Sequence, residues 1–413
     1  MGAWTAYLIL TGVSSFSFAL VFTVNLLYQV QTVRLSPLQL VLVGTMLEAV
    51  IVAGEVPTGV VADLMGRRRS ITIGLGLTGV GFIVEGLFPV FAAILLAQVL
   101  WGIGITFASG AQEAWVADEL GVERAGAAYL RGGQVGRVGG LLGLGASVAL
   151  GRLRLNLPIV SGGILFILLA CVLLVAMPER GFRPVLRERR STRMAMSETL
   201  GEGVRLVRGR PALIAILVAG VVAGAASEGF DRLWTVHLLR DVGLPVVGSL
   251  SPVIWIGGIN AGSMLLGIGA AELLRRRIDL SSSRAVALTL LGIQAGIVLG
   301  VIGFGVAASF PVALATLWLV VLLRDLADPL TATWIGQQIG AASGVRATVM
   351  SLSNQLNAFG QLAGGPGVGA VGNRSVRAAL VLSGLLLAPA VPLVGWAAAS
   401  SEHPEAGVDG GVQ

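Results

Sequence analysis

Long apolar runs, separated by short polar connections, fill almost the whole chain. Crossing the hydrocarbon core of a bilayer, about 30 Å thick, takes about 20 apolar residues in a helix. Since backbone polar groups have no water partner in lipid, each run must satisfy them within its own helix. The pattern predicts an all-α membrane protein with twelve transmembrane helices, near residues 4–30, 38–62, 71–88, 91–116, 125–150, 157–177, 211–239, 251–274, 284–303, 310–334, 345–371 and 376–398.

Composition supports the membrane class and excludes several kinds of site. Hydrophobic residues make up 55% of the chain and charged residues 12%, with a mean hydropathy of +0.87. Soluble proteins carry about twice that share of charge. One cysteine, Cys171, excludes an intrachain disulfide, and two distant histidines, His237 and His403, argue against a metal site. We also expect no enzyme, because the connections leave no room for a soluble catalytic domain.

Arginine distribution predicts the orientation in the membrane. All 28 basic residues are arginines, of which eighteen fall in the connections of one side, six in those of the other, and four within spans. Cytoplasmic connections are the ones enriched in basic residues. We therefore expect a plasma (inner) membrane protein with both termini in the cytoplasm, and we ascribe the net charge of +6 to this asymmetry, not to nucleic-acid binding.

The two halves of the chain contain similar charged motifs. Asp63 followed by Arg67–Arg69 recurs 209 positions later as Glu272 followed by Arg275–Arg277. Such weak internal symmetry is typical of a duplicated six-helix unit. The sequence thus predicts two pseudo-symmetric six-helix bundles, at residues 1–177 and 211–398, joined by a cytoplasmic linker, 178–210, and followed by a cytoplasmic tail, 399–413.

The connection after the second span carries a family signature. Gly59-x-x-x-Asp63-x-x-Gly66-Arg67-Arg68 resembles the signature loop of the major facilitator superfamily, transporters built of two six-helix bundles. The resemblance implies a conformational latch, in which Asp63 faces the start of the eleventh span near Arg346 and holds the cytoplasmic side shut. An acidic group at a helix N-terminus is stabilised by the helix dipole.

More narrowly, the strings 55–59 and 110–119 are similar to the drug:proton antiporter branch that includes tetracycline and macrolide exporters. Two motifs depart from that branch. The fourth-span motif, with an arginine ahead of a Gln-Gly pair, appears as Gln98-Val-Leu-Trp101-Gly102-Ile-Gly104 without the arginine, and Arg137 replaces the proline of the antiporter motif in span five. These departures leave open whether the usual residues couple transport to protons.

Acidic residues within the spans are candidates for proton coupling, since a charge inside a bilayer is costly and normally faces a partner or water. Glu48 and Arg137 are both expected near the membrane midplane, as a proton or substrate site or as a permanent ion pair. Glu55 and Glu113 are expected near the cytoplasmic side, as part of an inner gate or as helix caps.

Candidate substrate contacts combine aromatic rings, amides and two acids. An apolar cavity with few polar groups is typical of small-molecule sites. Packing between helices is the alternative for each amide, and pairing with Arg232 is the alternative for the acids. The candidates are Phe18, Phe22, Asn25, Glu228, Asp231, Asn260, Asn354, Asn357 and Gln361.

From these features we predict a secondary active transporter that exports an amphipathic, drug-like small molecule in exchange for protons. The resemblance to the family implies a monomer. A proton-coupled uptake symporter for a small metabolite and a non-transporting membrane sensor or scaffold are the alternatives. Apart from lipid and substrate we expect no partner and, apart from the proton gradient, no cofactor. A chain without lysine has no G-x-x-x-x-G-K-[ST] nucleotide loop.

Overall fold

The fold is helical throughout the residues that the computed structural model describes, which are 1–181, 201, 205–248, 250–340 and 343–400. The predicted tail and most of the predicted linker lie outside those residues. The helices are α1 (Ala3–Gln31), α2 (Pro37–Met65), α3 (Arg67–Leu87), α4 (Phe91–Leu120), α5 (Val122–Gly151), α6 (Asn156–Ala176), α8 (Pro211–His237), the π-helix η1 (Leu238–Val242), α9 (Pro252–Arg277), α10 (Ser283–Val306), α11 (Phe310–Ile339), α12 (Ser343–Gly372), α13 (Val376–Leu387) and α14 (Ala390–Ser400).

Within the described residues, ten helical segments are long and apolar enough to cross a membrane. They confirm the all-α membrane class. α5 and α12 are not among the ten, although each has 30 residues. α5 carries Arg124, Arg131 and Arg137, and both helices are rich in glycine, so their apolar character is weaker. The last predicted span consists of α13 and α14, which are separated by Ala388 and Pro389.

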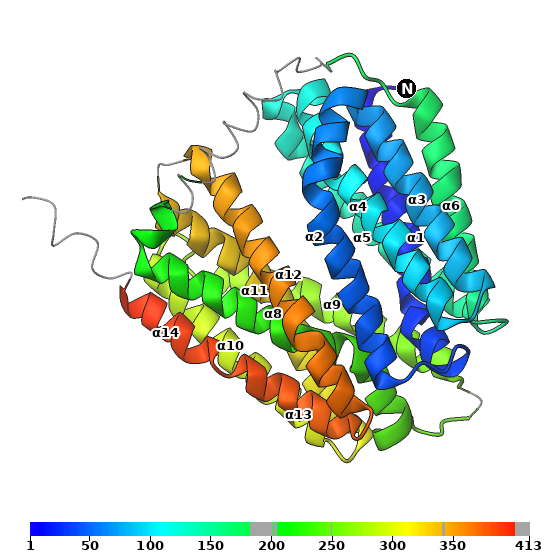
Figure 1. Cartoon of the computed structure of the whole chain (residues 1–413), viewed down its shortest axis with the longest axis vertical. Helices are drawn as coiled ribbons and strands as arrows, with labels where there is room; N and C mark the ends of the chain where they lie inside the picture. The colour runs from blue at the N-terminus through cyan, green and yellow to red at the C-terminus, as the bar shows by residue number, and fades with distance from the viewer. Residues whose placement is uncertain (182–200, 202–204, 249, 341–342, 401–413) are drawn as a thin grey trace, which may run out of the picture. The chain divides into compact units, whose positions relative to one another are not determined.

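The first compact unit comprises Met1–Leu186 and Leu244–Ala261. In it α1 packs against α5 and α6, α3 packs against α4 and α6, and α2 packs against α4 (Figure 1). Glycine permits the close approach of α1 and α5, since a Cβ at Gly143 would lie 2.2 Å from the carbonyl oxygen of Phe16. Small residues commonly bring membrane helices together in this way.

The second compact unit comprises Arg187–Gly243 and Gly262–Gln413. Its central helix, α8, packs against α12, α13 and α14, and α10 packs against α11, α13 and α14. α8 and α12 touch backbone to backbone: a Cβ at Gly224 would lie 2.0 Å from the carbonyl oxygen of Asn357, and one at Gly360 would lie 2.1 Å from that of Val221.

α9 contributes to both units. Its beginning packs on α5, where a Cβ at Gly257 would lie 2.2 Å from Val148. Further along, a Cβ at Gly262 would lie 2.5 Å from the Trp318 ring of α11. Glycine thus provides the room for α9 at each of these contacts. Asn260, which the sequence assigns to the second bundle, lies in the part of α9 that belongs to the first unit.

Candidate functional site

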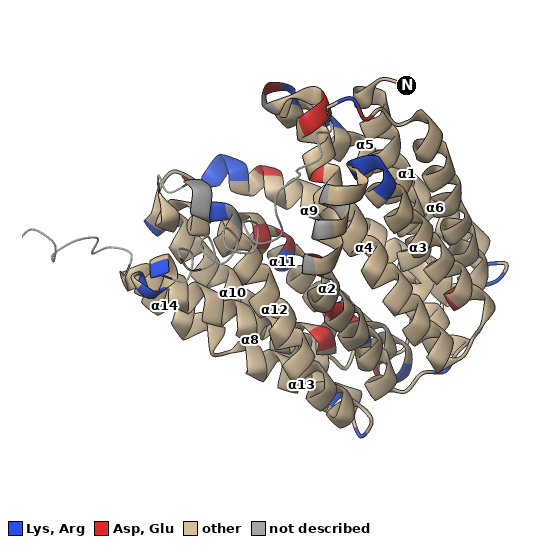
Figure 2. Cartoon of the chain, turned by 45° about the horizontal axis from the view of Figure 1, so that its top comes forward, with Lys and Arg blue, Asp and Glu red and all other residues tan. Residues whose placement is uncertain are grey.

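Charged residues gather mostly at the helix ends and in the connections (Figure 2). A fully buried acid, Glu85 of α3, is an exception. Its Oε1 accepts hydrogen bonds from Asn25 Nδ2 at 3.0 Å and from Gln29 Nε2 at 2.8 Å. The Tyr28 hydroxyl donates to the Glu85 carbonyl oxygen at 2.9 Å, and all these α1 side chains are buried. The structure therefore places the predicted substrate contact Asn25 in a buried carboxylate–amide cluster.

Five aromatic rings lie beside that cluster. Phe22 lies one helical turn from Asn25 on α1. Its ring stacks on that of Phe18, with ring centroids 5.7 Å apart, and its centroid lies 5.1 Å from that of the Trp101 ring of α4. Phe82 and Phe166 complete the group. Phe22 is 41% exposed, so one side of the aromatic cluster is accessible. Within the described residues, the buried Trp101 Nε1 has no hydrogen-bond acceptor.

The four predicted proton-coupling residues all belong to the first unit. Glu48 is half-buried in α2, whereas Glu55, Glu113 and Arg137 are exposed. The Glu48–Arg137 pair, as a proton or substrate site or as a permanent ion pair, stays a prediction. A hydrogen-bonded acid inside the helix bundle is found at Glu85.

The signature loop forms charged contacts within the first unit. Gly66 separates α2 from α3 with a φ of 98°, a conformation that glycine adopts readily. The Arg68 backbone N–H donates to Glu179 Oε1 at 2.8 Å, and Arg67 lies 3.8 Å from Asp118 at the end of α4. We call these four charged residues the clasp. The side chain of Asp63 lies outside the described residues, so its contact with the eleventh span stays a prediction.

Two further contacts fix the chain that follows α6 at the clasp. Trp115 Nε1 donates to the Pro178 carbonyl oxygen at 2.7 Å, and the Gly181 N–H donates to Glu119 Oε1 at 2.6 Å. A Cβ at Gly66 would lie 2.8 Å from Glu179 Oε1, and the φ of 98° would strain any residue with a side chain, so the turn favours glycine. The first residues of the predicted linker are thereby held against α3 and α4.

Replacing Glu179 by glutamine should lower the stability of the first unit by about 1–2 kcal/mol, because Arg68 loses a charged acceptor at its backbone and at its guanidinium. Thermal unfolding of the purified protein in detergent measures the loss. The matched control is Glu123→Gln, which changes an exposed acid in the first turn of α5. Equal melting temperatures for Glu179→Gln and the native chain would contradict the stabilising role of the clasp.

In the second unit the acids of α8 have separate partners. Glu228 pairs with Arg232 one turn along, at 3.3 Å. Asp231 instead accepts two hydrogen bonds from Arg324 of α11, one of them 2.9 Å long. The predicted alternative, pairing of Asp231 or Glu228 with Arg232, is found at Glu228, whereas Asp231 is paired with Arg324. A bidentate pair of this kind ties two helices together with defined geometry.

Amides of α12 mostly serve helix packing. Asn357 Nδ2 donates to the Gly220 carbonyl oxygen of α8 at 3.0 Å, and Gln361 Nε2 donates to Asn357 Oδ1 at 2.9 Å. Asn354, one turn earlier, is exposed. Of the three predicted α12 substrate contacts, Asn354 is thus the most accessible.

His237 forms a buried polar link that the sequence gives no reason to expect. Its Nε2 lies 2.9 Å from the Phe304 carbonyl oxygen in the last turn of α10, and its Nδ1 lies 2.9 Å from Asp241 Oδ2. A carbonyl oxygen only accepts, so Nε2 carries a proton. The link joins the end of α8 to the last turn of α10, next to the ring of Phe304.

Sequence reasoning missed Glu85 and Glu179 as well as His237. Glu85 is the one acid in the third predicted span, and an acid within a span is the signal that could have identified it as a candidate. Its partners on α1 lie 56 to 60 residues away, so spacing could not reveal them. Glu179 lies just beyond the sixth span, within a stretch that the sequence identifies only as a polar linker.

Comparison with known proteins identifies the family. The family model described as Major Facilitator Superfamily matches residues 7–365. A curated relative is the "Uncharacterized MFS-type transporter YxaM" of Bacillus subtilis (strain 168), 24% identical over 227 residues. That match covers 54% of this chain and 55% of the relative, so the chain spans about half the length of the relative that it matches.

Solved structures share the fold. A nucleoside transporter, NupG, is 13% identical with a TM-score of 0.72, covering 98% of this chain and 100% of that chain. A peptide transporter, POT, in complex with sulfate is 16% identical with a TM-score of 0.68, covering 96% and 95%. Identities this low concern the fold alone, and the drug:proton antiporter branch stays a prediction. With a family model that matches most of its length and a helical membrane fold, this chain belongs to the major facilitator superfamily and is a multi-pass membrane transporter.

Proposed function

We propose that this transporter exports an amphipathic small molecule in exchange for protons. The observation that carries the proposal is that one face of α1 contacts both the aromatic cluster and the buried acid Glu85 of α3. Phe18, Phe22 and Asn25 follow each other by four and three residues, so they share one helix face, and Asn25 bonds to Glu85.

The chemistry of this face suits a molecule with an aromatic part and a polar part. The exposed ring of Phe22 offers a stacking surface, and stacking of aromatic rings contributes about 0.5–1.5 kcal/mol beyond the area buried. Trp101 Nε1, without an acceptor among the described residues, is a donor for a substrate oxygen. Aromatic faces also attract cationic groups. A ligand of this kind needs few charges in its site.

Proton coupling in this proposal uses acids of the first unit. Glu48 is half-buried in α2, and Glu85 is held by two amides in α1. An acid in a low-dielectric site gains or loses its proton when water or a charged partner reaches it. Alternating access changes that contact in each cycle. Glu55 and Glu113, which are exposed, remain candidates for the proton path on the cytoplasmic side.

The remaining features of the proposal follow from the sequence. We place the chain in the plasma membrane as a monomer with both termini in the cytoplasm, driven by the proton gradient without a bound cofactor. Substrate contacts from the second half are proposed at Glu228, Asp231, Asn260, Asn354, Asn357 and Gln361. The exposed Asn354 is the first of these to test.

The experiment compares the native chain with Glu48→Gln and Glu85→Gln. In a pump-deficient host, the native chain should raise resistance to a panel of amphipathic drugs, and each variant should abolish that resistance while remaining in the membrane. In vesicles, each variant should lose gradient-driven export but keep exchange of labelled for unlabelled substrate, because binding persists without coupling. Glu272→Gln, which changes an acid of α9 whose side chain is 43% exposed, is the matched control.

Each rival function predicts a different result. If an inward-directed proton gradient drives the substrate into the vesicles together with the protons, the protein is an uptake symporter. If no compound on the panel moves in either direction, the sensor or scaffold alternative holds. Full resistance in both glutamine variants would remove Glu48 and Glu85 from the proton path.

A further inference from the structure

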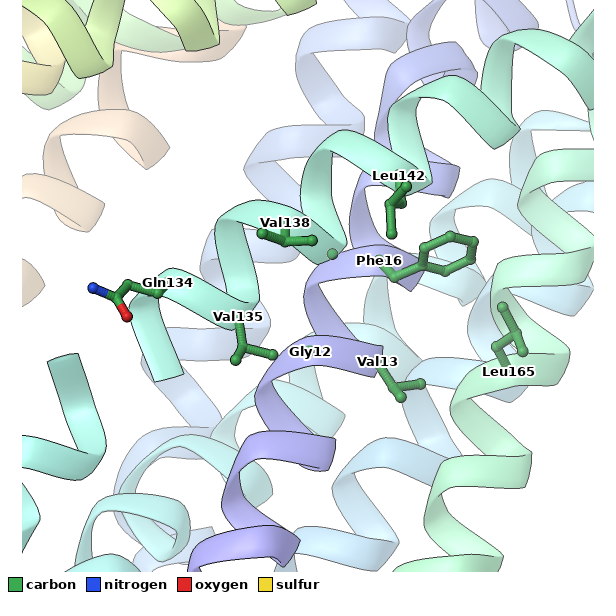
Figure 3. Close-up of a pocket in the computed structure, with 9 residues that line it drawn as sticks. Gly12, Val13, Phe16, Gln134, Val135, Val138, Leu142 and Leu165 are labelled. Carbon is green, nitrogen blue, oxygen red and sulfur yellow. The ribbon is translucent and has the colours of Figure 1, made fainter. Parts of the chain in front are cut away.

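A groove opens on the surface of the first unit. Its volume is about 540 Å³, and it lies between α5 and α6 with α1 as its floor. The walls are apolar, formed mainly by Phe16, Val135, Val138, Leu142 and Leu165. Figure 3 shows the side chains of Leu142, Phe16 and Leu165, from three different helices, around the same space.

The surroundings of the groove are those of a lipid-facing surface. Val138 and Leu142 are 58% and 62% exposed, and on α6 the neighbouring Leu168 and Val172 are 55% and 50% exposed. Large contiguous apolar patches mark contact with a membrane or with another protein. In a membrane transporter, lipid is the phase that such a side surface meets.

One end of the groove is positively charged. Arg131, Val135, Val138 and Leu142 follow each other by four, three and four residues, so Arg131 continues the face of α5 that forms the groove wall. The Arg131 guanidinium donates to Gln134 Oε1 at 3.1 Å, and Gln134 also lines the groove. Arg124 lies two turns further back on the same face.

Neither arginine is neutralised by the protein. Arg124 and Arg131 are exposed, and neither forms an ion pair with any residue in the described part of the chain. From Arg131 to Leu142 the helix rises about 16 Å, which matches one leaflet of a hydrocarbon core about 30 Å thick. A long arginine side chain extends its charge toward the headgroup layer while its carbon stem stays in apolar surroundings.

We propose that this groove binds an anionic glycerophospholipid, with the phosphate at Arg131 and Arg124 and one acyl chain along Val135, Val138 and Leu142. Charge complementarity selects the headgroup, and the depth of the groove suits a single chain of one leaflet. The site is distinct from the proposed transport path.

The test uses the full chain in phosphatidylcholine vesicles containing a trace of phosphatidylglycerol with a photoreactive group in its acyl chain. After illumination, mass spectrometry should find the label on peptides that contain residues 12–16 and 135–142. Unlabelled phosphatidylglycerol should compete and added phosphatidylcholine should not. Arg131→Gln should lower the labelling about fivefold, the effect of one basic residue near an anionic lipid surface, and Arg131→Lys should retain it.

Arg137→Gln is the matched control, because Arg137 lies on the same helix about 120° around from Arg131 and is also exposed. Labelling should be unchanged in that variant. All variants are first compared by size-exclusion chromatography and thermal unfolding. Equal labelling by a photoreactive phosphatidylcholine, or labelling that Arg131→Gln leaves unchanged, would overturn the proposal. Displacement by an amphipathic drug but not by phosphatidylglycerol would assign the groove to the transported molecule instead.

Discussion

Replacing Gly224 by alanine should destabilise the second unit by about 3 kcal/mol, the upper part of the range for overpacked cores. The added Cβ would lie 2.0 Å from the carbonyl oxygen of Asn357 and 2.9 Å from its carbonyl carbon, both backbone atoms that cannot rotate away. α8 and α12 must therefore separate. Asn357 would also lose its bond to Gly220, which needs the present spacing.

Gly220→Ala is the matched control for this prediction, since it lies one turn away on α8 and a Cβ there has nothing within 4 Å. It should be neutral or slightly stabilising, because alanine favours a helix over glycine by about 0.5–1 kcal/mol. Thermal unfolding in detergent should separate the two variants by on the order of 10 °C. Similar melting temperatures for both alanine variants would show that α8 and α12 are not in backbone contact.

Removing Asp231 should have the second largest effect on stability. Asp231→Ala leaves Arg324 without the carboxylate that accepts two of its hydrogen bonds. A hydrogen bond to a charged group contributes about 1.5–3 kcal/mol. Breaking a fully buried pair costs more, about 3–5 kcal/mol, but both side chains here keep contact with solvent, so we expect about 2–3 kcal/mol.

A double-mutant cycle measures this interaction directly. Asp231→Ala, Arg324→Ala and the double variant should unfold with a coupling free energy of about 1–2 kcal/mol between the two positions. Glu272→Gln breaks an exposed pair with Arg275 and should leave the melting temperature unchanged. Strict additivity of the two alanine variants would show that the pair does not link α8 to α11.

The helical membrane fold could be predicted from the sequence because its signal is local. A run of apolar residues long enough to cross a bilayer has few alternatives, and ten such helical segments are found in the described residues. α5 gives a weaker signal because its arginines and glycines make the helix less apolar. Gly139 and Gly143 fit against the backbone of α1, where a larger residue would clash.

The partners of the charged residues could not be predicted in the same way. Asp231 has Arg232 as its neighbour in sequence, yet its carboxylate meets Arg324, which is 93 residues away on α11. Glu48 and Arg137 are expected at similar depths, but depth alone does not determine the direction of a side chain around a helix. Asn25 illustrates the same limit, since its partner Glu85 lies on another helix, 60 residues away.

The unequal lengths of neighbouring helices determine the environment of the clasp. α3 has 21 residues, about 32 Å, enough for the hydrocarbon layer, whereas α4 starts just after α3 ends and has 30 residues, about 45 Å. The final turns of α4, with Asp118 and Glu119, therefore exceed the length that the hydrocarbon layer requires, and we expect them in the hydrated headgroup zone. Dissolved ions reach that zone and shorten the range of electrostatic attraction from about 8 Å at physiological ionic strength to about 3 Å at 1 M. We therefore expect added salt to weaken the 3.8 Å contact between Arg67 and Asp118, while the hydrogen bonds of Glu85 inside the bundle are shielded from salt.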